Sequence, residues 1–395
     1  MSAGPRDTHH DPTSGRAHGD DGHPGRAAVE LAGDTVSGAA ERGAGTSGPN
    51  TVTRTGPAHA RGAEQALTGQ AGGRRRKKGD KNAVVPDAEF TSYYGRPIVK
   101  ASPWEKDIPA YLFLGGVAAG SSLLGAGADL SDRPALRRTG RVGALVALTL
   151  SMVALVHDLG RPERFHHMLR VAKPTSPMSV GTWILTFYGP FMGLAGAAEL
   201  LPRRFRASLA GRLLGLSARP AGLVAAVVAP AVASYTAVLL SDTATPTWHD
   251  AHRHLPFVFV GSASAASGGL GMIGAPVDQA GPARRLAVGG ALLELAVENR
   301  MEKAMGITAE PLHAGTPGKL VRASKALTVA GTLGTLLVGR RSRLGAAVSG
   351  AALMAGSACL RFGVFEAGQE SARDPRYTVV PQRERVEAGR ATRIP

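Results

Sequence analysis

Cysteine is almost absent from this chain. Its 395 residues include a single cysteine, Cys359, which lies inside an apolar run. One cysteine excludes a disulfide within the chain, a cysteine-ligated iron–sulfur cluster and a structural zinc site built on cysteines. If the protein takes part in electron transfer, the iron–sulfur centres must therefore belong to another subunit.

The first 90 residues lack apolar periodicity and contain hardly any aromatic residue. They are rich in Gly, Ala, Arg, Thr, His and Asp, a composition that buries too little apolar surface to offset the entropy lost on ordering. We therefore predict a disordered basic and polar tail over residues 1–90. No apolar h-region follows a basic n-region, so we expect no secretory signal.

Acidic residues are fewer than basic ones, with 30 Asp and Glu against 46 Lys and Arg, which gives a formal net charge of +16. Much of this charge lies in the tail, as in GGRRRKKGDK (72–81), and in short loops between apolar runs. A nucleic-acid-binding domain gathers its charge on one face of a folded domain. We therefore expect no nucleic-acid partner.

Apolar runs recur from Ile108 onward, and about 20 such residues are needed to cross a bilayer. Glu294 and Glu298 interrupt one of the three weaker runs. A soluble all-α protein is the alternative, but these runs carry Gly, Ala and Ser where an amphipathic helix carries a charged stripe. The stronger runs are 108–130, 142–158, 178–201, 220–241 and 255–274, and the weaker ones are 284–300, 320–339 and 343–366.

The sequence thus predicts an all-α polytopic membrane protein of the cell membrane with about eight transmembrane helices. The helix bundle occupies residues 91–370, between the N-terminal tail and a polar C-terminal tail over 371–395. Pairs of small residues four positions apart predict close helix packing. These pairs are Gly116/Gly120, Ser121/Gly125 and Gly189/Gly193.

Eight spans place both tails and the even-numbered loops on one face, here named face A, and the odd-numbered loops on the other, face B. The face B loops are short and rich in arginine, which favours a cytoplasmic location for that face, but the basic N-terminal tail would then have to cross the membrane, so both orientations stay open. The same loops contain neither histidine nor tryptophan. The asymmetry indicates that face A carries the chemistry. On face A lie Trp104, Trp183, Trp248, His157, His166, His167, His249, His252, His254 and His313.

The densest set of ionisable groups is HDLGRPERFHH (157–167), directly after the second run. His157 beside Asp158 at the membrane boundary can exchange protons near neutral pH. Arg161 and Arg164 can keep that carboxylate charged or bind a quinone carbonyl. The alternative is an interfacial loop that contacts lipid headgroups and caps the helix.

A second polar loop, SDTATPTWHDAHRH (241–254), adds Asp242 and His249 on face A. The spacing of its histidines fits no standard zinc pattern, so we predict no metal site. None of the twelve histidines lies in the interior of a predicted span, since His157 is at the very end of the run 142–158, and this argues against haem.

Carboxylates do occur inside or at the ends of the predicted spans. Charged groups in a membrane are costly, so Glu294 and Glu298 point to proton handling or to pairing. Glu199 and Glu366 lie near helix ends, and we interpret both as side chains that reach out to the interface.

Three stretches resemble the NrfD/PsrC family of integral membrane subunits, and the actinobacterial members most closely. They are YYGRPIVKASPWEKDIPAYLFLGGVAAGSSLL (93–124), HDLGRPERFHHMLRVAKPTSPMSVGTW (157–183) and SYTAVLLSDTATPTWHDAHRHLPFVF (234–259). The resemblance extends over about 93–370. It implies an eight-helix anchor without haem that exchanges electrons between a quinone, menaquinone for this branch, and a partner subunit.

The partners that the resemblance implies are a four-cluster ferredoxin-like iron–sulfur subunit and a molybdopterin catalytic subunit, so this chain would hold no complete active site of its own. Carried over by position, the candidate site residues are His157 and Asp158 for proton transfer, with Arg161, Arg164, Trp183, Asp242 and His249 around the quinone. Trp183 could stack on the quinone ring.

Two other functions remain open from the residues. A secondary transporter for a small anion would use the arginines as ligands, but such folds usually show inverted repeats and broken helices near the midplane. A purely structural anchor would recruit a soluble enzyme without exchanging electrons.

Overall fold

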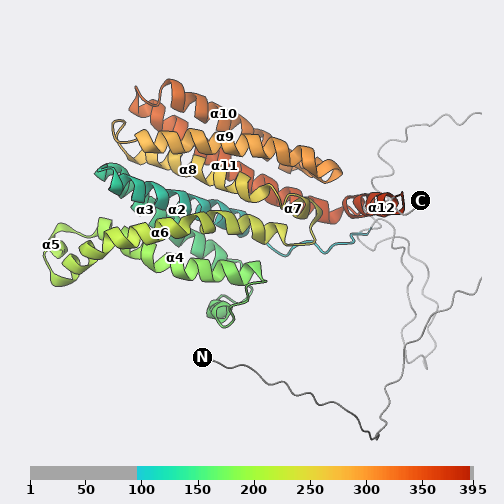
Figure 1. Ribbon diagram of the computed structural model, residues 1–395, viewed down its shortest axis with the longest axis horizontal. Helices are drawn as coiled ribbons and strands as arrows, with labels where there is room; N and C mark the ends of the chain where they lie inside the picture. Colours follow the sequence, from blue (N-terminus) through green and yellow to red (C-terminus); the bar gives the residue numbers. More distant parts are fainter. Residues whose placement is uncertain (1–95, 392–395) are drawn as a thin grey trace, which may run out of the picture. The chain divides into compact units, whose positions relative to one another are not determined.

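The computed structural model describes residues 96–391, so the tail predicted over 1–90 lies outside them. Eight long helices occupy the positions of the eight predicted spans, and this prediction is confirmed (Figure 1). Five of them, α2, α3, α6, α8 and α11, are long and apolar enough by composition alone to cross a membrane. The eight are α2 (Asp107–Leu130), α3 (Pro134–His157), α4 (Pro177–Leu200), α6 (Leu209–Ser241), α8 (Leu255–Gly274), α9 (Gly281–Met305), α10 (Gly315–Leu337) and α11 (Arg343–Arg373).

Short helices form most of the connections. The loop between α3 and α4 contains the 3₁₀ helix η1 (Pro162–Leu169), and α5 (Arg203–Arg206) joins α4 to α6. On face A, α7 (Pro246–Asp250) precedes α8, and the 3₁₀ helix η2 (Gly306–Leu312) follows α9. The segment predicted as a polar C-terminal tail contains the end of α11 and the helix α12 (Arg376–Ala391).

The long helices form two groups of four. Helices α2, α3, α4 and α6 pack together, as do α8, α9, α10 and α11, and α2 contacts both α8 and α11 between the groups. Because successive helices are antiparallel, face A contains the ends marked by α7 and α12, and face B contains the end marked by α5 (Figure 1).

Small residues let the helices approach closely at two of the three predicted pairs. A Cβ at Gly116 would lie 3.1 Å from that of Ala263 on α8, and Gly120 lies against Ser267 on the same helix. Gly125 lies against Gly140 on α3. The third pair was predicted wrongly, because a Cβ at Gly189 or Gly193 would meet nothing within 4 Å.

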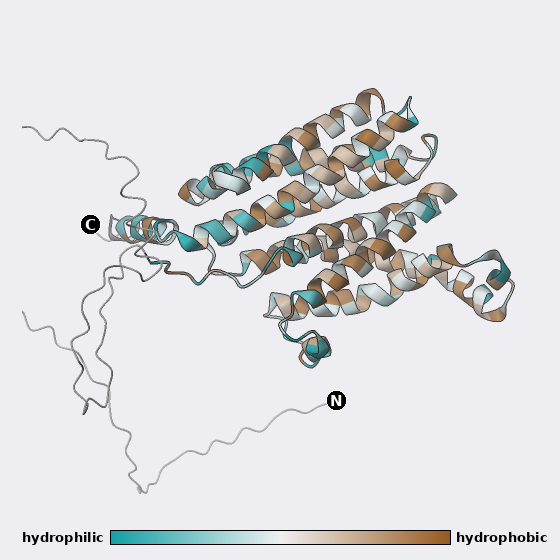
Figure 2. Ribbon diagram, turned by 180° about the vertical axis from the view of Figure 1, so that it is seen from behind, coloured by the Kyte–Doolittle hydropathy of each residue, from teal (hydrophilic) through white to brown (hydrophobic). Residues whose placement is uncertain are grey.

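Apolar side chains also cover the outside of the bundle, as a membrane protein requires. Val153, Val227 and Leu336 are 61%, 80% and 58% exposed on the surfaces of α3, α6 and α10. Figure 2 shows hydrophobic residues along the long helices and many of the hydrophilic ones near their ends. The protein is therefore a multi-pass membrane protein.

Among the helix boundaries that differ from prediction, those of α6 and α3 have a clear physical reason. Helix α6 begins at Leu209, well before residue 220, because Ser208 caps it by accepting a hydrogen bond from the N–H of Gly211 at 3.1 Å. Its internal Pro220 and Pro230 do not end it, since membrane helices tolerate proline. Helix α3 begins at Pro134, and its polar first turns carry Arg137 and Arg141.

Glu199 does not reach out to the membrane interface, so that interpretation was wrong. Its carboxylate is 2.8 Å from Arg137 and 3.1 Å from Arg141, and its side chain is only 10% exposed. The basic first turns of α3 therefore pair with the end of α4 inside the protein.

Candidate functional site

The polar run HDLGRPERFHH follows the end of α3 on face A. The backbone N–H of Asp158 still donates to the carbonyl of Ala154 at 3.2 Å, and that of Leu159 donates to Val156 at 3.2 Å. Gly160 and Pro162 then break the helix, and η1 begins at Pro162. The carboxylate of Asp158 is thereby held at the membrane end of the bundle.

Two cavities that share one wall lie beside the first turns of α4. The inner cavity, of about 130 Å³, is bounded by α2, α3, α4 and α6, and its lining includes Trp104, Ile108, Tyr111, Asp158, Gly181 and Tyr235. The outer cavity, of about 630 Å³, has a lining that includes Ile184, Tyr235, Ser241, Asp242, His249 and His252. Tyr235 belongs to both linings and separates the two.

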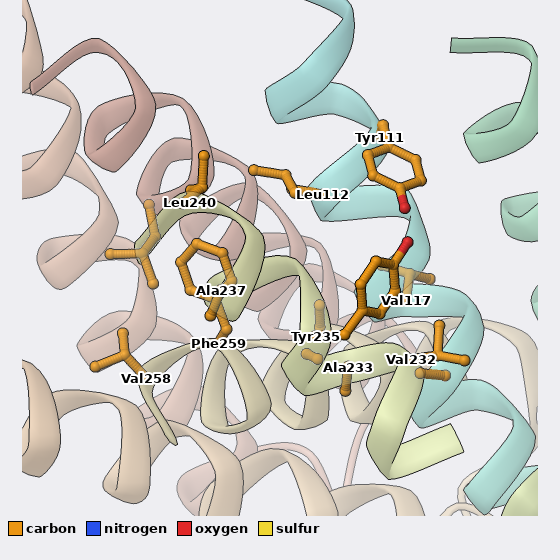
Figure 3. Packing of buried hydrophobic residues seen from close by; sticks show 14 of the residues in the cluster. Tyr111, Leu112, Val117, Val232, Ala233, Tyr235, Ala237, Leu240, Val258 and Phe259 are labelled. Carbon is orange, nitrogen blue, oxygen red and sulfur yellow. The ribbon is translucent and has the colours of Figure 1, made fainter. Parts of the chain in front are cut away.

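Two tyrosine side chains face each other at the inner cavity. Tyr111 on α2 is 2% exposed and Tyr235 on α6 is 7% exposed. Figure 3 shows their hydroxyl groups pointing toward one another, and both rings line the cavity. Within residues 96–391, the Tyr235 hydroxyl has no hydrogen-bond partner. A buried hydroxyl without a partner is costly, which marks it as a group available to a ligand.

The ring of Tyr235 reaches this position because residue 181 is glycine. A Cβ on Gly181 would overlap the edge of the Tyr235 ring. Glycine in α4 therefore allows the edge of the α6 tyrosine ring to approach the neighbouring helix closely, which any larger residue would prevent.

Asp158 lines the inner cavity and is only partly exposed. Its Oδ1 accepts a hydrogen bond from the backbone N–H of Glu105 at 3.3 Å. Burial, reinforced by the nearby carboxylates of Asp107 and Glu105, raises the pKa of Asp158 above its ordinary value. A carboxyl group with a raised pKa can exchange a proton closer to neutral pH.

His157 does not lie toward the cavity. Its side chain is 78% exposed, and its Nδ1 lies 2.8 Å from Oδ2 of Asp107 at the start of α2. The carboxylate hydrogen-bonded to this imidazole is therefore that of Asp107, which is not among the residues predicted from the sequence.

Arg161 and Arg164 are both exposed and belong to the lining of neither cavity. Figure 1 shows their segment, between α3 and α4, lying away from the long helices. These arginines therefore lie on the surface of face A, and neither forms an ion pair with Asp158 among residues 96–391.

The other candidate residues are divided between cavities. Asp242 and His249 line the outer cavity together with His252. Trp183 is 43% exposed and lines a third cavity of about 390 Å³, which shares Pro174, Val180 and Ile184 with the outer one. The structure thus brings Asp158, Asp242, His249 and Trp183 around the first turns of α4, in adjoining cavities.

Trp248 has a packing role. It is fully buried, its Nε1 donates to the carbonyl of Val364 at 2.8 Å, and its ring stacks on Trp104 with centroids 6.1 Å apart. This contact holds α7 and the segment before α2 against α11. At least one of the three tryptophans that lie on face A therefore stabilises the fold and lines neither the inner nor the outer cavity.

Tyr111 and Tyr235 are not among the site residues predicted from the sequence. Both are aromatic residues with a polar group inside apolar runs, in IPAYLFL and ASYTAVL. A phenol within a span needs a partner for its hydroxyl. A tyrosine inside an apolar run could therefore have been noticed from the sequence. Only the packing shows that the hydroxyl of Tyr235 has no hydrogen-bond partner among the described residues.

A separate series of ionisable residues lies in the second group of helices. Glu294 and Glu298 on α9 are 0% and 1% exposed. Glu294 accepts a hydrogen bond from Thr328 at 3.1 Å, and the carboxylate of Glu298 lies 3.8 Å from Lys325. The same lysine lies 2.7 Å from Glu302. Because α9 carries these carboxylates four residues apart, they follow one face of the helix from the middle of the bundle toward face A.

Arg361 on α11 completes the buried charges near Glu294. It is 1% exposed, donates to the carbonyl of Phe259 at 2.8 Å, and lies over the Phe259 ring at 3.6 Å from its centroid. Its Nε and Nη1 have no hydrogen-bond partner in the part of the chain described. This cation therefore sits between the two groups of helices, where Gly116 on α2 leaves room for it.

A family model described as Polysulphide reductase, NrfD matches residues 99–277. The match covers α2 to α8 and every residue that lines the inner and outer cavities. No curated protein matches the chain. Together with the bundle of membrane helices, the match confirms the resemblance identified from the sequence: residues 99–277 are similar to the NrfD family, whose members are membrane subunits of redox enzyme complexes.

Proposed function

We propose that this chain is the quinone-interacting, haem-free membrane subunit of its complex. In this role it passes electrons between the membrane quinone pool and an iron–sulfur cluster in a partner subunit. The observation that carries the proposal is the inner cavity at face A, which is lined by Tyr111, Asp158 and Tyr235, the last with a hydroxyl that has no hydrogen-bond partner among residues 96–391.

The residues of the two cavities fit a quinone. A quinone presents an apolar ring and two carbonyl acceptors, so its site needs apolar walls and a small number of donors. Ile108 and Leu185 supply apolar wall in the inner cavity, and Val180 and Val238 supply it in the outer one. A bound quinone supplies a redox couple of two electrons and two protons.

The side chains then have separable roles. The hydroxyl of Tyr235 donates a hydrogen bond to an acceptor in the cavity and is thereby satisfied. Asp158, whose pKa is raised by burial, holds or releases a proton at the rim of the inner cavity. His157, exposed beside Asp107, exchanges protons with water at the same face.

The proposed partners are those that the family resemblance implies, a four-cluster ferredoxin-like iron–sulfur subunit and a molybdopterin catalytic subunit. We place the iron–sulfur subunit on face A, because electrons must reach it from the cavities and because Arg161 and Arg164 are exposed there. Menaquinone is the quinone that we propose.

The test is a matched pair of tyrosine variants in the purified complex. Tyr235→Phe removes the hydroxyl that has no partner in the described part of the chain. Tyr188→Phe removes a buried hydroxyl that donates to the carbonyl of Ala118 at 3.0 Å, and Tyr188 lines neither cavity. We expect Tyr235→Phe to lower quinone-linked activity roughly tenfold or more, the effect of losing one hydrogen bond that acts on the reacting group. Tyr188→Phe should reduce stability but not the activity of the folded complex.

Activity with an artificial electron acceptor reports the partner enzyme alone, and it should be unchanged in both variants. Equal quinone-linked activity in the two variants, or equal quinone content after purification, would count against a quinone site at the inner cavity.

A second candidate role, proton transfer through the α8–α11 half, is favoured by the buried carboxylate series. The series continues from Lys325 and Glu302 to His313, which is 54% exposed and lies 3.8 Å from Glu302. Chains of ionisable residues inside membranes commonly conduct protons. The measurement is proton uptake by proteoliposomes containing the complex. Glu298→Gln should abolish it while quinone-linked electron transfer continues, and unchanged uptake would reject this role.

A further inference from the structure

A third polar region lies on face B, at the opposite end of the bundle from the cavities described above. It is a cavity of about 500 Å³ between the end of α2, the first turns of α3, the end of α4 and the start of α6. We name it the basic cavity. Its charged lining consists of Asp129, Glu199, Arg137, Arg141, Arg206, Arg212 and Arg219.

The two carboxylates of the basic cavity already form ion pairs with arginines of the same cavity. Asp129 lies 3.3 Å from Arg137, 3.1 Å from Arg141 and 3.6 Å from Arg219. Glu199 is paired with Arg137 and Arg141 in turn, and both carboxylates are at most 10% exposed. These carboxylates form the floor of the cavity and are not free to bind a cation.

The remaining arginines give the cavity an excess of positive charge. Five arginines face two carboxylates, so the formal excess is three. Arg206 donates from Nε to the carbonyl of Leu201 at 3.1 Å, which fixes its position. Neither Arg206 nor Arg212 has a carboxylate within salt-bridge distance among residues 96–391. The cavity therefore attracts an anion.

The shape of the cavity depends on two glycines of α6. Gly211 and Gly215 contribute lining without a side chain, and a Cβ at Gly215 would meet nothing within 4 Å. Guanidinium groups around such a space match phosphate oxygens, since each can donate two parallel hydrogen bonds.

An apolar ridge beside the basic cavity indicates the source of the phosphate. Leu209, Leu213 and Leu216 on the first turns of α6 are 75%, 58% and 75% exposed, and Phe205 on α5 is 49% exposed. The three leucines, at positions i, i+4 and i+7, share one helix face. In a membrane, such a ridge is covered by acyl chains, whose phosphate lies at the level of the helix ends.

We propose that the basic cavity binds the phosphate headgroup of an anionic phospholipid from the leaflet at face B. Arg206 and Arg212 hold the headgroup, and the ridge of Leu209, Leu213 and Leu216 contacts its acyl chain. The lipid then ties the α4–α6 connection, residues 201–208, to the ends of α3 and α4. This site is separate from the cavities at face A and does not depend on the function proposed for them.

The experiment compares phospholipids with the purified complex in mild detergent. Phosphatidylglycerol should raise the melting temperature, remain bound in native mass spectra, and outcompete phosphatidylcholine. The double variant Arg206→Gln/Arg212→Gln should bind phosphatidylglycerol at least about tenfold more weakly, since it loses two charge-assisted contacts. Its quinone-linked activity should stay near that of the unmodified complex.

The matched control is Arg340→Gln/Arg341→Gln, two exposed arginines in the α10–α11 loop on the same face, outside the lining of the basic cavity. It should keep the lipid effect. Equal loss in both double variants would show a general effect of surface charge and overturn the site. Equal stabilisation by inorganic phosphate and by phosphatidylglycerol would identify a free-anion site and overturn the lipid assignment.

A second variant keeps the test valid if the arginine variant assembles poorly. Gly215→Leu fills the cavity without changing its charge, and leucine favours helix more than glycine does. The variant should assemble and lose bound phosphatidylglycerol. If the lipid remains bound with unchanged affinity, the headgroup does not occupy this cavity.

Discussion

The ring of Tyr235 on α6 lies so close to Gly181 on α4 that a Cβ at residue 181 would overlap its edge. This contact joins the two helices that separate the inner cavity from the outer one. The position of the tyrosine hydroxyl is thus fixed by a glycine 54 residues away, and substitution of that glycine tests whether the position matters.

Gly181→Ala should displace the Tyr235 ring and reduce quinone-linked activity. Overpacking of this kind costs roughly 1–3 kcal/mol, so the melting temperature of the complex should also fall. The control is Gly193→Ala on the same helix, where the new methyl group meets nothing within 4 Å, so both properties should be retained. If the two variants have the same activity, the position of Tyr235 is not important for function.

The eight helices could be predicted from the sequence because crossing a bilayer is a local requirement. Each run needs enough apolar residues in succession, whatever its neighbours are. The weakest prediction, 284–300, corresponds to α9 even though Glu294 and Glu298 interrupt it. These two carboxylates face the interior of the bundle, where Thr328 and Lys325 accommodate them.

The candidate site could be predicted only as a region. The polar loops at face A showed that Asp158, Asp242 and His249 would lie at one end of the bundle. They could not show that His157 pairs with Asp107, 50 residues earlier, or that Arg161 and Arg164 would lie on the surface. Such pairings depend on which helices become neighbours, and no periodicity within one segment contains that information.

Asp158→Asn should lower quinone-linked activity by about 10²–10⁴, the usual contribution of a general acid or base. The control is Arg204→Ala in α5 on face B, which should have little effect. Activity with an artificial acceptor should be unchanged in both variants. If both variants behave alike, the polar run after α3 is only an interfacial loop.

The pH dependence of the same reaction provides a further check. Burial raises the pKa of Asp158, so its carboxylate becomes protonated at a higher pH than an ordinary aspartate. Where quinol oxidation needs the ionised form as proton acceptor, activity should rise as the pH increases through this raised pKa. Steady-state rates should show an acid limb centred above the ordinary aspartate value, and Asp158→Asn should lack it. If the acid limb of the pH profile persists in Asp158→Asn, another ionisable group causes it.

Deletion of residues 1–85 should leave membrane insertion intact, because this segment has no apolar pattern that could contribute to a packed bundle. The measurement is the amount of the shortened chain in the membrane fraction and its assembly with the partner subunits. Failure to insert, or rapid degradation, would identify the segment as a folding or targeting element.

Arg361 and Glu294 offer a test of the buried charges in the second half of the bundle. Arg361→Met removes the cation over the Phe259 ring and with it a positive charge that acts on the carboxylate of Glu294. Because removal of one of two interacting buried charges leaves the other uncompensated, the melting temperature should fall markedly.

The double variant Arg361→Met/Glu294→Gln removes both charges and should recover much of that loss, because replacing a buried ion pair by uncharged groups is often nearly neutral. The four proteins of this cycle therefore measure the coupling between the two residues. If the two single substitutions change the free energy of unfolding by amounts that simply add in the double variant, the two residues are independent. Arg361 would then be held only by Phe259, through its carbonyl and its ring.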